Sequence, residues 1–456
     1  MSKLMTRDKS FYRTLIMLAI PITLQNAITF AVGFADNLMV GTLGELAIAG
    51  VYVGNQLQTF LQFAVSGLSS AAMIISAHYW GRRDTVSIKK VSAMTTLICV
   101  AVGALSAVIA LLIPRQLLGL FTDDVLVIEE GVSYLEIVCI SYVFFCISQM
   151  AISALRSVES VRIGLINSIV ALITNITLNY VLIFGKLGFP ALGVRGAAIA
   201  TLISRIVETA VMVIYIFRID TKLRFKPREI FLYDSSLIRD LFRYGTPVLA
   251  GQIVWAINQL SQSAIIGHMS TEVVASVSIA GMLNSMLYMI VIGLSAALGV
   301  ITGKTVGAGE YEKMKEYSYT SQIIFALLGV IMGTAVFLLK DLFISFYNLA
   351  DQTKVVAEQF MIVLAVAMVG RCYQAPLLAG LVKAGGDTGF VFKNDTIFVF
   401  GVVLPSALIA QFVFDAPPWV VYACLQSDQI LKCFVAVVKI NSFNWMKNLT
   451  RTQENA

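Results

Sequence analysis

Charged residues are scarce in this chain. Only 13% of its 456 residues are Asp, Glu, Lys or Arg, whereas 58% are hydrophobic. The mean hydropathy of +0.83 lies far above that of a soluble domain and excludes that class. A chain in lipid must satisfy its own backbone hydrogen bonds, and continuous rather than alternating apolar runs favour helices over a barrel. We therefore expect an all-α integral membrane protein.

Residues suited to catalysis or metal binding are also few. The chain has two histidines and six cysteines without a C-x-x-C pair, which argues against a metal cluster or a disulfide framework. Gly303-Lys304-Thr305 resembles the end of a phosphate-binding loop, but Leu298 stands where that pattern requires its first glycine. No Ser-Lys, His-rich or paired-acid arrangement is visible on the apolar runs. We expect no enzyme activity, no cofactor and no nucleic-acid partner, and keep an intramembrane enzyme as the weaker alternative.

Apolar runs long enough to cross a bilayer are frequent, since about 20 residues cover the hydrocarbon core. We expect twelve spans, near residues 14–40, 46–79, 91–113, 132–155, 163–184, 196–217, 244–268, 272–303, 317–339, 357–381, 396–414 and 417–438. The last is the weakest, because Asp428 and Lys432 interrupt it.

The two halves of the chain repeat each other at one constant offset, the distance in sequence from Pro21 to Pro247. The elements Pro21, Gly41, Gly67-Leu68-Ser69 and Gly81 recur as Pro247, Gly267, Gly293-Leu294-Ser295 and Gly307. Six spans per half is an even number, so the repeat is parallel, as in many secondary transporters. We expect an amino-terminal lobe (1–217), a basic cytoplasmic linker (218–243), a carboxy-terminal lobe (244–440) and a cytoplasmic tail (441–456).

The basic residues set the expected orientation, because cytoplasmic loops retain Lys and Arg. With both termini in the cytoplasm, the basic start that includes Lys3 and the basic linker lie inside, and two arginines lie within spans. The basic residues left outside are Arg115, Lys186, Arg195, Lys340 and Lys354. We interpret the linker's charge as a topology signal and a contact with lipid headgroups.

Asp36 is the leading functional candidate within the spans. It follows an uncharged run over residues 14–35, and an ionisable group at such a place usually faces a cavity or a partner. A carboxylate there either holds a proton or gathers oxygen ligands around a cation. Asn175 and Asn179 share one helix face, and Thr201 could add a hydroxyl. Alternatively, Asp36 caps a helix end and the asparagines bond neighbouring helices.

Other positions in the spans have more structural interpretations. Pro21 removes one backbone hydrogen bond and would let the first helix bend. Arg205 and Glu208 are three residues apart, so we expect an ion pair, with a substrate contact as the alternative. Gly329 and Gly333 form a small-residue face that favours close helix packing.

Several local motifs together resemble one known family. They are Asp36-Asn37-Leu38-Met39-Val40-Gly41 with Leu43-Gly44, Asn175-x-x-x-Asn179-Tyr180, Gly193-x-x-Gly196-Ala197-Ala198, and Gly385-Gly386-Asp387-Thr388. Over nearly its whole length the chain resembles the multidrug and toxic compound extrusion (MATE) transporters, of the multidrug/oligosaccharidyl-lipid/polysaccharide flippase superfamily.

The resemblance implies a V-shaped pair of six-helix lobes that works by alternating access. It implies export of amphiphilic, often cationic drugs or toxic metabolites in exchange for H⁺ or Na⁺. The alternative is a flippase for a lipid-linked or other amphiphilic substrate. The implied coupling residues are Asp36, Asn175, Asn179 and Thr201, and Pro21 matches the bending proline. We expect a monomer in the bilayer of a bacterial inner membrane.

The chain also departs from the family pattern in its second half. One branch of the family has an aspartate three residues before a glutamine of the tenth span, and here Arg371 precedes Gln374. The same branch has a glutamate where this chain has Trp255. A buried guanidinium does not coordinate Na⁺, so the coupling site is expected in the amino-terminal lobe alone. Two interpretations remain, internal pairing or a place in a substrate cleft, for Arg371, Gln374 and Trp255.

Overall fold

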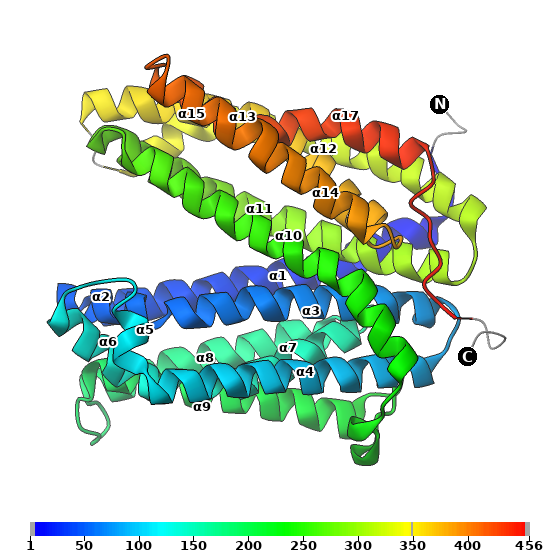
Figure 1. The fold of residues 1–456 in the computed structure, drawn as a ribbon, viewed down its shortest axis with the longest axis horizontal. Coiled ribbons are helices and arrows are strands. Elements are labelled where there is room, and N and C mark those ends of the chain that lie inside the picture. The colour runs from blue at the N-terminus through cyan, green and yellow to red at the C-terminus, as the bar shows by residue number, and fades with distance from the viewer. Residues whose placement is uncertain (1–4, 348–349, 452–456) are drawn as a thin grey trace. The chain divides into compact units, whose positions relative to one another are not determined.

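Every regular element among the described residues is a helix (Figure 1). The computed structural model describes residues 5–347 and 350–451, so Lys3 and residues 452–456 of the expected tail lie outside the described residues. The predicted fold class, an all-α membrane protein, is confirmed by this architecture.

The first half of the chain contains ten of the labelled elements. They are α1 (Lys9–Gly41), α2 (Glu45–Gly54), α3 (Gln56–Gly81), α4 (Thr85–Leu112), α5 (Pro114–Leu118), α6 (Val125–Val138), α7 (Ser141–Ser157), α8 (Arg162–Phe184), α9 (Gly193–Ile214) and its π-helical end η1 (Tyr215–Ile219). Asp84 and Asp124 start α4 and α6 by accepting hydrogen bonds from the backbone N–H groups of Ser87 and Leu126.

The second half begins after a short turn, η2 (Pro227–Phe231). Its helices are α10 (Ser235–Gly267), α11 (Thr271–Gly307), α12 (Tyr311–Ser345), α13 (Asp351–Leu377) with η3 (Leu378–Lys383), α14 (Thr388–Phe398) with η4 (Val399–Val403), α15 (Leu404–Phe412), α16 (Pro418–Leu425) and α17 (Ser427–Asn441).

The helices account for the expected spans. Within the described ranges, ten helical runs are long and apolar enough to cross a bilayer, and α6 with α7, bent by 53°, would be an eleventh. The helix α10 coincides with the remaining expected span. The weakest expected span is among the ten, and within it Lys432 forms an ion pair of 3.1 Å with Asp428 one turn earlier.

The sequence repeat is visible in the helix boundaries. The helices α1 and α10 are equally long, and the offset from Pro21 to Pro247 relates both their first and their last residues. The same offset relates the start of α2 to the start of α11, and the end of α3 to the end of α11. It also relates the start of α6 to that of α13, and the start of α8 to that of α14. The two halves therefore share one plan of helices, whatever polar residues each one carries.

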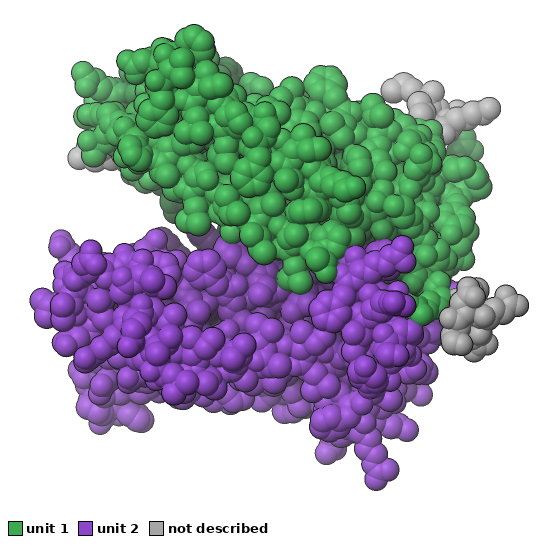
Figure 2. All heavy atoms as spheres, viewed as in Figure 1, with its two compact units in different colours: residues 1–23, 246–455 green, residues 24–245, 456 purple. Residues whose placement is uncertain are grey.

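The chain divides into two compact units, which Figure 2 shows in different colours. Unit 1 comprises residues 1–23 and 246–455, and unit 2 comprises residues 24–245. The division falls inside α1 and inside α10, close to Pro21 and Pro247. Each of these two helices thus contributes to both units, and each contains the proline of the repeat near that point.

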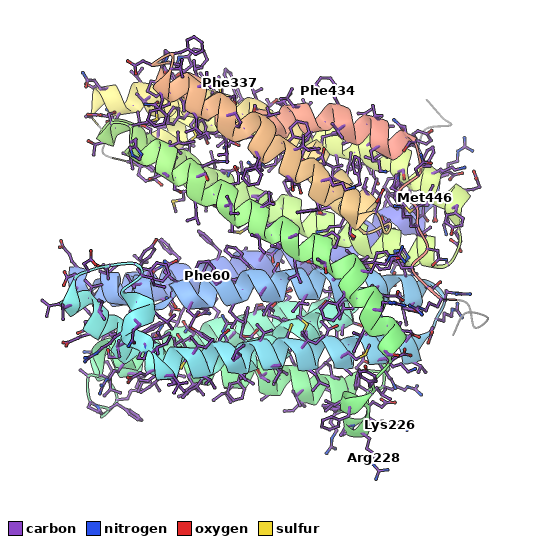
Figure 3. All side chains as sticks on the ribbon, viewed as in Figure 1. Phe60, Lys226, Arg228, Phe337, Phe434 and Met446 are labelled. Carbon is purple, nitrogen blue, oxygen red and sulfur yellow. The ribbon has the colours of Figure 1, made fainter. Side chains whose placement is uncertain are left out.

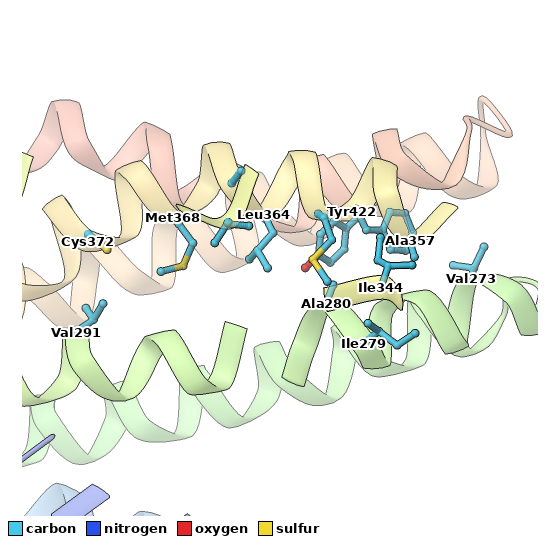
Figure 4. Close-up of a cluster of buried hydrophobic side chains, with 14 residues drawn as sticks. Val273, Ile279, Ala280, Val291, Ile344, Ala357, Leu364, Met368, Cys372 and Tyr422 are labelled. Carbon is cyan, nitrogen blue, oxygen red and sulfur yellow. The ribbon is translucent and has the colours of Figure 1, made fainter. Parts of the chain in front are cut away.

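A cluster of buried apolar side chains forms the core of unit 1 (Figure 4). Phe360 and Tyr422 stack at its centre, with ring centroids 4.6 Å apart. Leu364 and Met368 of α13 and Val291 of α11 belong to the same cluster. Lipid tails are as apolar as these side chains, so the cluster stabilises the unit through close packing rather than through exclusion of water.

The helices α12 and α13 pack closely against each other. A Cβ atom at Gly329 would lie 2.5 Å from the carbonyl oxygen of Val369, and one at Gly333 would lie 2.6 Å from that of Ala365. Only glycine allows the two backbones to approach this closely.

The basic linker is only partly irregular. Residues 235–243 belong to α10, and the preceding segment is attached to α4 by ion pairs from Lys89 to Glu229 (2.9 Å) and from Lys90 to Asp234 (3.0 Å). Lys226 and Arg228 remain exposed and extend away from the ribbon in Figure 3.

The segment after α17 is docked on unit 1. Trp445 is fully buried, and a Cβ atom at Gly385 would lie 2.3 Å from its ring. The Lys447 N–H donates to the carbonyl oxygen of Gly385 (2.7 Å). Asp387 accepts from Lys439 (2.7 Å) and Lys447 (2.8 Å). Burial opposes ionisation of Asp387, but these two hydrogen bonds outweigh it and hold its pKa below the ordinary 3.8.

The glycine contact predicts a specific loss of stability. Gly329→Ala should destabilise the protein by about 1–3 kcal/mol, because the new methyl group must displace the α13 backbone. Gly281→Ala is the matched control, since a Cβ atom there meets nothing within 4 Å. Thermal unfolding in detergent should show a lower midpoint for the first variant alone. Equal midpoints for both variants would contradict this packing.

The docking of the tail should depend on pH. Because the pKa of Asp387 is lowered, its stabilising contribution is complete above its unfolded pKa and disappears as the pH falls below 3.8. At neutral pH, Asp387→Asn should speed hydrogen exchange of the Lys447 amide about tenfold, the effect of losing one charge-assisted hydrogen bond. Exchange measured by mass spectrometry checks this, with Asp124→Asn as control. Unchanged exchange in Asp387→Asn would show that the charge of Asp387 does not hold the tail.

Candidate functional site

Asp36 lies near the end of α1 and faces α8. The side-chain amide of Asn179 donates a hydrogen bond to the Asp36 carboxylate and a second one, of 3.2 Å, to Oδ1 of Asn175. Asn179 and Asn175 are buried, with 0% and 2% exposure, one helical turn apart. The structure thus brings together Asp36, Asn175 and Asn179, three of the four residues that the sequence analysis placed in one site.

The local sequence explains why α8 holds this position. Gly185 ends α8 in the left-handed conformation (φ 64°), and the N–H of Leu192 then donates to the carbonyl oxygen of Leu182 (2.9 Å). A Cβ atom at Gly196 would lie 2.6 Å from that same oxygen. Gly185 and Gly196 therefore allow α9 to pack closely against α8. This packing brings polar side chains of both helices close to α1.

Tyr134 is a member of the site that sequence reasoning missed. Its hydroxyl donates to Oδ1 of Asn55 (3.1 Å), lies within hydrogen-bonding reach of Thr201, and is close enough to interact electrostatically with Asp36. Gly54 makes room for it, because a Cβ atom there would lie 3.0 Å from the tyrosine ring. A tyrosine in an apolar run carries no distinguishing signal, whereas an asparagine at the break between α2 and α3 does.

Arg205 adds a positive charge beside this site. It forms an ion pair with Glu208 (2.8 Å), and its guanidinium lies 5.0 Å from the centre of the Phe145 ring. It is also near enough to Asp36 to interact with its charge. With both carboxylates ionised, Asp36, Arg205 and Glu208 together carry one net negative charge.

One acceptor in the site has no partner. Oδ1 of Asn179 is buried and makes no hydrogen bond, although the amide of the same side chain makes two. The site therefore offers a carboxylate, two amide oxygens and two hydroxyl groups to a small cation or a proton. No group of three or more His, Cys, Asp or Glu side chains that could hold a metal ion occurs in the part of the chain that the structure describes.

Pro21 lies inside α1, which continues through it to Gly41. The proline leaves the carbonyl of Met17 without its usual helical donor but does not end the helix.

The second set of polar candidates lies in unit 1. Arg371 donates to side-chain oxygens of Asn284, Gln426 (3.0 Å) and Gln429 (3.2 Å). Gln374 donates to the same Gln429 oxygen at 3.0 Å. Arg371 and Gln374 are therefore joined through one shared partner. Trp255 lies on α10, with 43% of its surface exposed.

Comparison with known families gives a match in each half of the chain. The family model of MatE matches residues 21–181 and residues 247–409. The two matched segments begin at the two prolines of the repeat, Pro21 and Pro247. The duplication found in the sequence is thus also a duplication of the family's unit.

The curated relatives are similar along most of their length. The chain is 24% identical to the probable multidrug resistance protein NorM of Thermotoga maritima, covering 97% of this chain and 95% of that protein. It is 22% identical to the probable multidrug resistance protein YoeA of Bacillus subtilis, covering 89% of each.

Solved structures share the fold. An asparagine-for-aspartate mutant of the Vibrio cholerae MATE transporter VcmN matches with a TM-score of 0.87 at 15% identity, over 98% of this chain and 99% of that one. A MOP superfamily transporter of Pyrococcus furiosus, described by the reversed polarity of its binding pocket, matches with a TM-score of 0.84 at 18% identity, over 98% of this chain and all of that one.

Proposed function

The chain belongs to the MatE family of multidrug efflux transporters, and from this premise we propose that it is an antiporter that exports amphiphilic cations in exchange for H⁺ or Na⁺. The observation that carries the proposal is the carboxylate of Asp36, which lies within a membrane span and is bonded to the buried amide of Asn179. Placing an ionisable side chain within a membrane span costs free energy, and such side chains usually have a function.

The charge of the site supports the exchange of one cation at a time. Asp36, Arg205 and Glu208 leave one net negative charge, which a proton or one Na⁺ can neutralise. One charge that moves through 100 mV is worth about 2.3 kcal/mol, which sustains a concentration ratio of roughly fifty. An exported cation and the coupling ion would then compete for the same charge, and this competition links their movements.

The course of α1 supports a conformational role for this residue. Asp36 lies in the part of α1 that belongs to unit 2, while residues 9–23 of the same helix belong to unit 1. Neutralising Asp36 weakens its hydrogen bond to Asn179 and so frees the end of α1 from α8. In our proposal the released helix changes its path near Pro21, and this change drives alternating access.

The location and assembly belong to the same proposal. Relatives from bacteria and the bias of Lys and Arg towards one side of the spans support a bacterial inner membrane protein with both termini in the cytoplasm. We propose that the transporter works as a monomer.

Replacing Asp36 should abolish export. Asp36→Asn keeps the size of the side chain but removes the charge, so drug efflux from cells that express the variant should fall to the level of cells without the protein. The matched control is Asp124→Asn, because Asn caps a helix as well as Asp does. Efflux of a fluorescent organic cation, normalised to the amount of protein in the membrane, measures the effect. Transport at the wild-type rate in Asp36→Asn would remove Asp36 from the mechanism.

The coupling ion can be identified in proteoliposomes. A pH gradient and a Na⁺ gradient are imposed separately, and at least one of them should drive a fluorescent organic cation against its own concentration gradient. The same gradient should drive no transport in Asp36→Asn. If neither gradient drives transport by the wild-type protein, the antiport proposal is wrong, whatever the result with cells.

A further inference from the structure

Arg371 is a half-buried cation whose partners are all neutral. Its three hydrogen bonds go to the amide oxygens of Asn284, Gln426 and Gln429, and its guanidinium lies 5.4 Å from the centre of the Tyr288 ring. Among the residues that the structure describes, no carboxylate lies within ion-pair distance of it. Amides orient the guanidinium but leave its charge uncompensated.

The neighbouring charges do not supply the missing anion. Lys432 forms ion pairs with Asp395 (2.9 Å) and Asp428 (3.1 Å), and the half-buried Lys383 interacts electrostatically with Asp395. Both carboxylates are therefore engaged by lysines, and neither forms an ion pair with Arg371. The positive charge of Arg371 is thus not compensated by these groups.

The fold itself does not require a cation at this position. The residue at the equivalent place of the first repeat, which the offset from Pro21 to Pro247 identifies, is Phe145. An apolar side chain therefore satisfies the same helix packing in unit 2. This contrast favours binding rather than structure as the reason for Arg371.

A groove of about 470 Å³ lies between α13 and the α16–α17 pair. Its walls are almost entirely apolar and include Ile362, Val366 and Trp419, which are 39%, 57% and 44% exposed. Both α13 and α16–α17 qualify as membrane spans by length and composition, so the groove lies between two membrane-spanning segments. Gln426 also lines the groove, and its Oε1 is the atom that accepts from Arg371 at 3.0 Å.

We propose that this groove binds an acidic amphiphile that enters from the bilayer, with its alkyl chain against Trp419 and Val366 and its carboxylate bound by Gln426 and Arg371. The apolar walls fit a chain, and a guanidinium matches a carboxylate with two parallel hydrogen bonds. A cationic amphiphile of the same length would meet a like charge at the inner end of the groove. All residues of this site lie in unit 1, whereas Asp36 lies in unit 2. Binding at this site therefore does not depend on the export proposed above.

The intrinsic fluorescence of Trp419 provides a direct test. Three brominated probes with the same chain, namely dibromostearic acid, its methyl ester and the corresponding alkyl trimethylammonium, are titrated into the full-length protein in neutral vesicles without any gradient. Subtracting the signal of Trp419→Phe isolates quenching in the groove. The acid should reach half-quenching at a concentration about tenfold lower than the ester, as one charge-assisted hydrogen-bonded pair provides. The cation should bind no better than the ester.

Variants then assign the charge. Arg371→Gln should raise the half-quenching concentration of the acid to that of the ester, and Arg371→Lys should recover part of the difference. Lys340→Gln is the matched control, because Lys340 is a cation of the same unit that already pairs with Asp341 and Glu358, and it should leave the preference unchanged.

Two results would overturn the proposal. One is equal quenching of wild-type protein by acid and ester, which would show that the groove holds ordinary lipid chains. The other is an acid preference that survives in Arg371→Gln. If Arg371→Gln does not fold, Gln426→Leu replaces it, since that variant keeps the charge but removes the group between Arg371 and the groove. It should weaken binding of the acid, and undiminished binding would count against the site.

Discussion

The hydrogen bond between Asn179 and Asp36 is the interaction on which the account of this protein depends. It fastens α1 to α8 at a point within the membrane span, and it does so through a carboxylate whose charge can be removed. The nearby pair of Arg205 and Glu208 lies within α9 and is internally neutral, so it leaves no net charge. Asp36, like Arg371 in the other unit, is bonded to amides instead of to an opposite charge at ion-pair distance. An ion or ligand of opposite charge would therefore be stabilised most strongly beside these two residues.

The internal duplication supplies a scaffold and leaves its chemistry free to differ. Helices of the two halves begin and end at the same offset, yet the position of Asp36 in the second repeat is occupied by Gln262, and that of Arg371 in the first repeat by Phe145. One unit therefore carries a negative site and the other a positive one on the same plan of helices. Small residues preserve the plan, as where Gly329 meets the backbone of α13, while single polar substitutions set what each unit can bind.

Much of the fold and part of the site could be predicted from the sequence. The spans and their repeat are predictable because a helix in lipid must be continuous and apolar, and Asp36, Asn175 and Asn179 stand out as polar groups within such runs. Contacts between helices distant in sequence were not predictable from spacing. Tyr134 reaches the site only because α6 packs against α2.

The end of the chain shows a second limit. The segment after α17 reads as a polar tail, but Trp445 is buried against Gly385. The sequence around Trp445 does not indicate that this side chain packs against Gly385, because the contact forms only when distant parts of unit 1 have folded together.

The most direct test of the central claim is equilibrium binding of an organic cation to the purified protein across a range of H⁺ and Na⁺ concentrations, with and without the charge of Asp36. If that carboxylate is the shared site, the affinity of the wild-type protein for the organic cation should fall as the coupling ion rises, and the affinity of Asp36→Asn should not respond. Affinity that is independent of both ions in the wild type, or a response that persists in Asp36→Asn, would contradict the account.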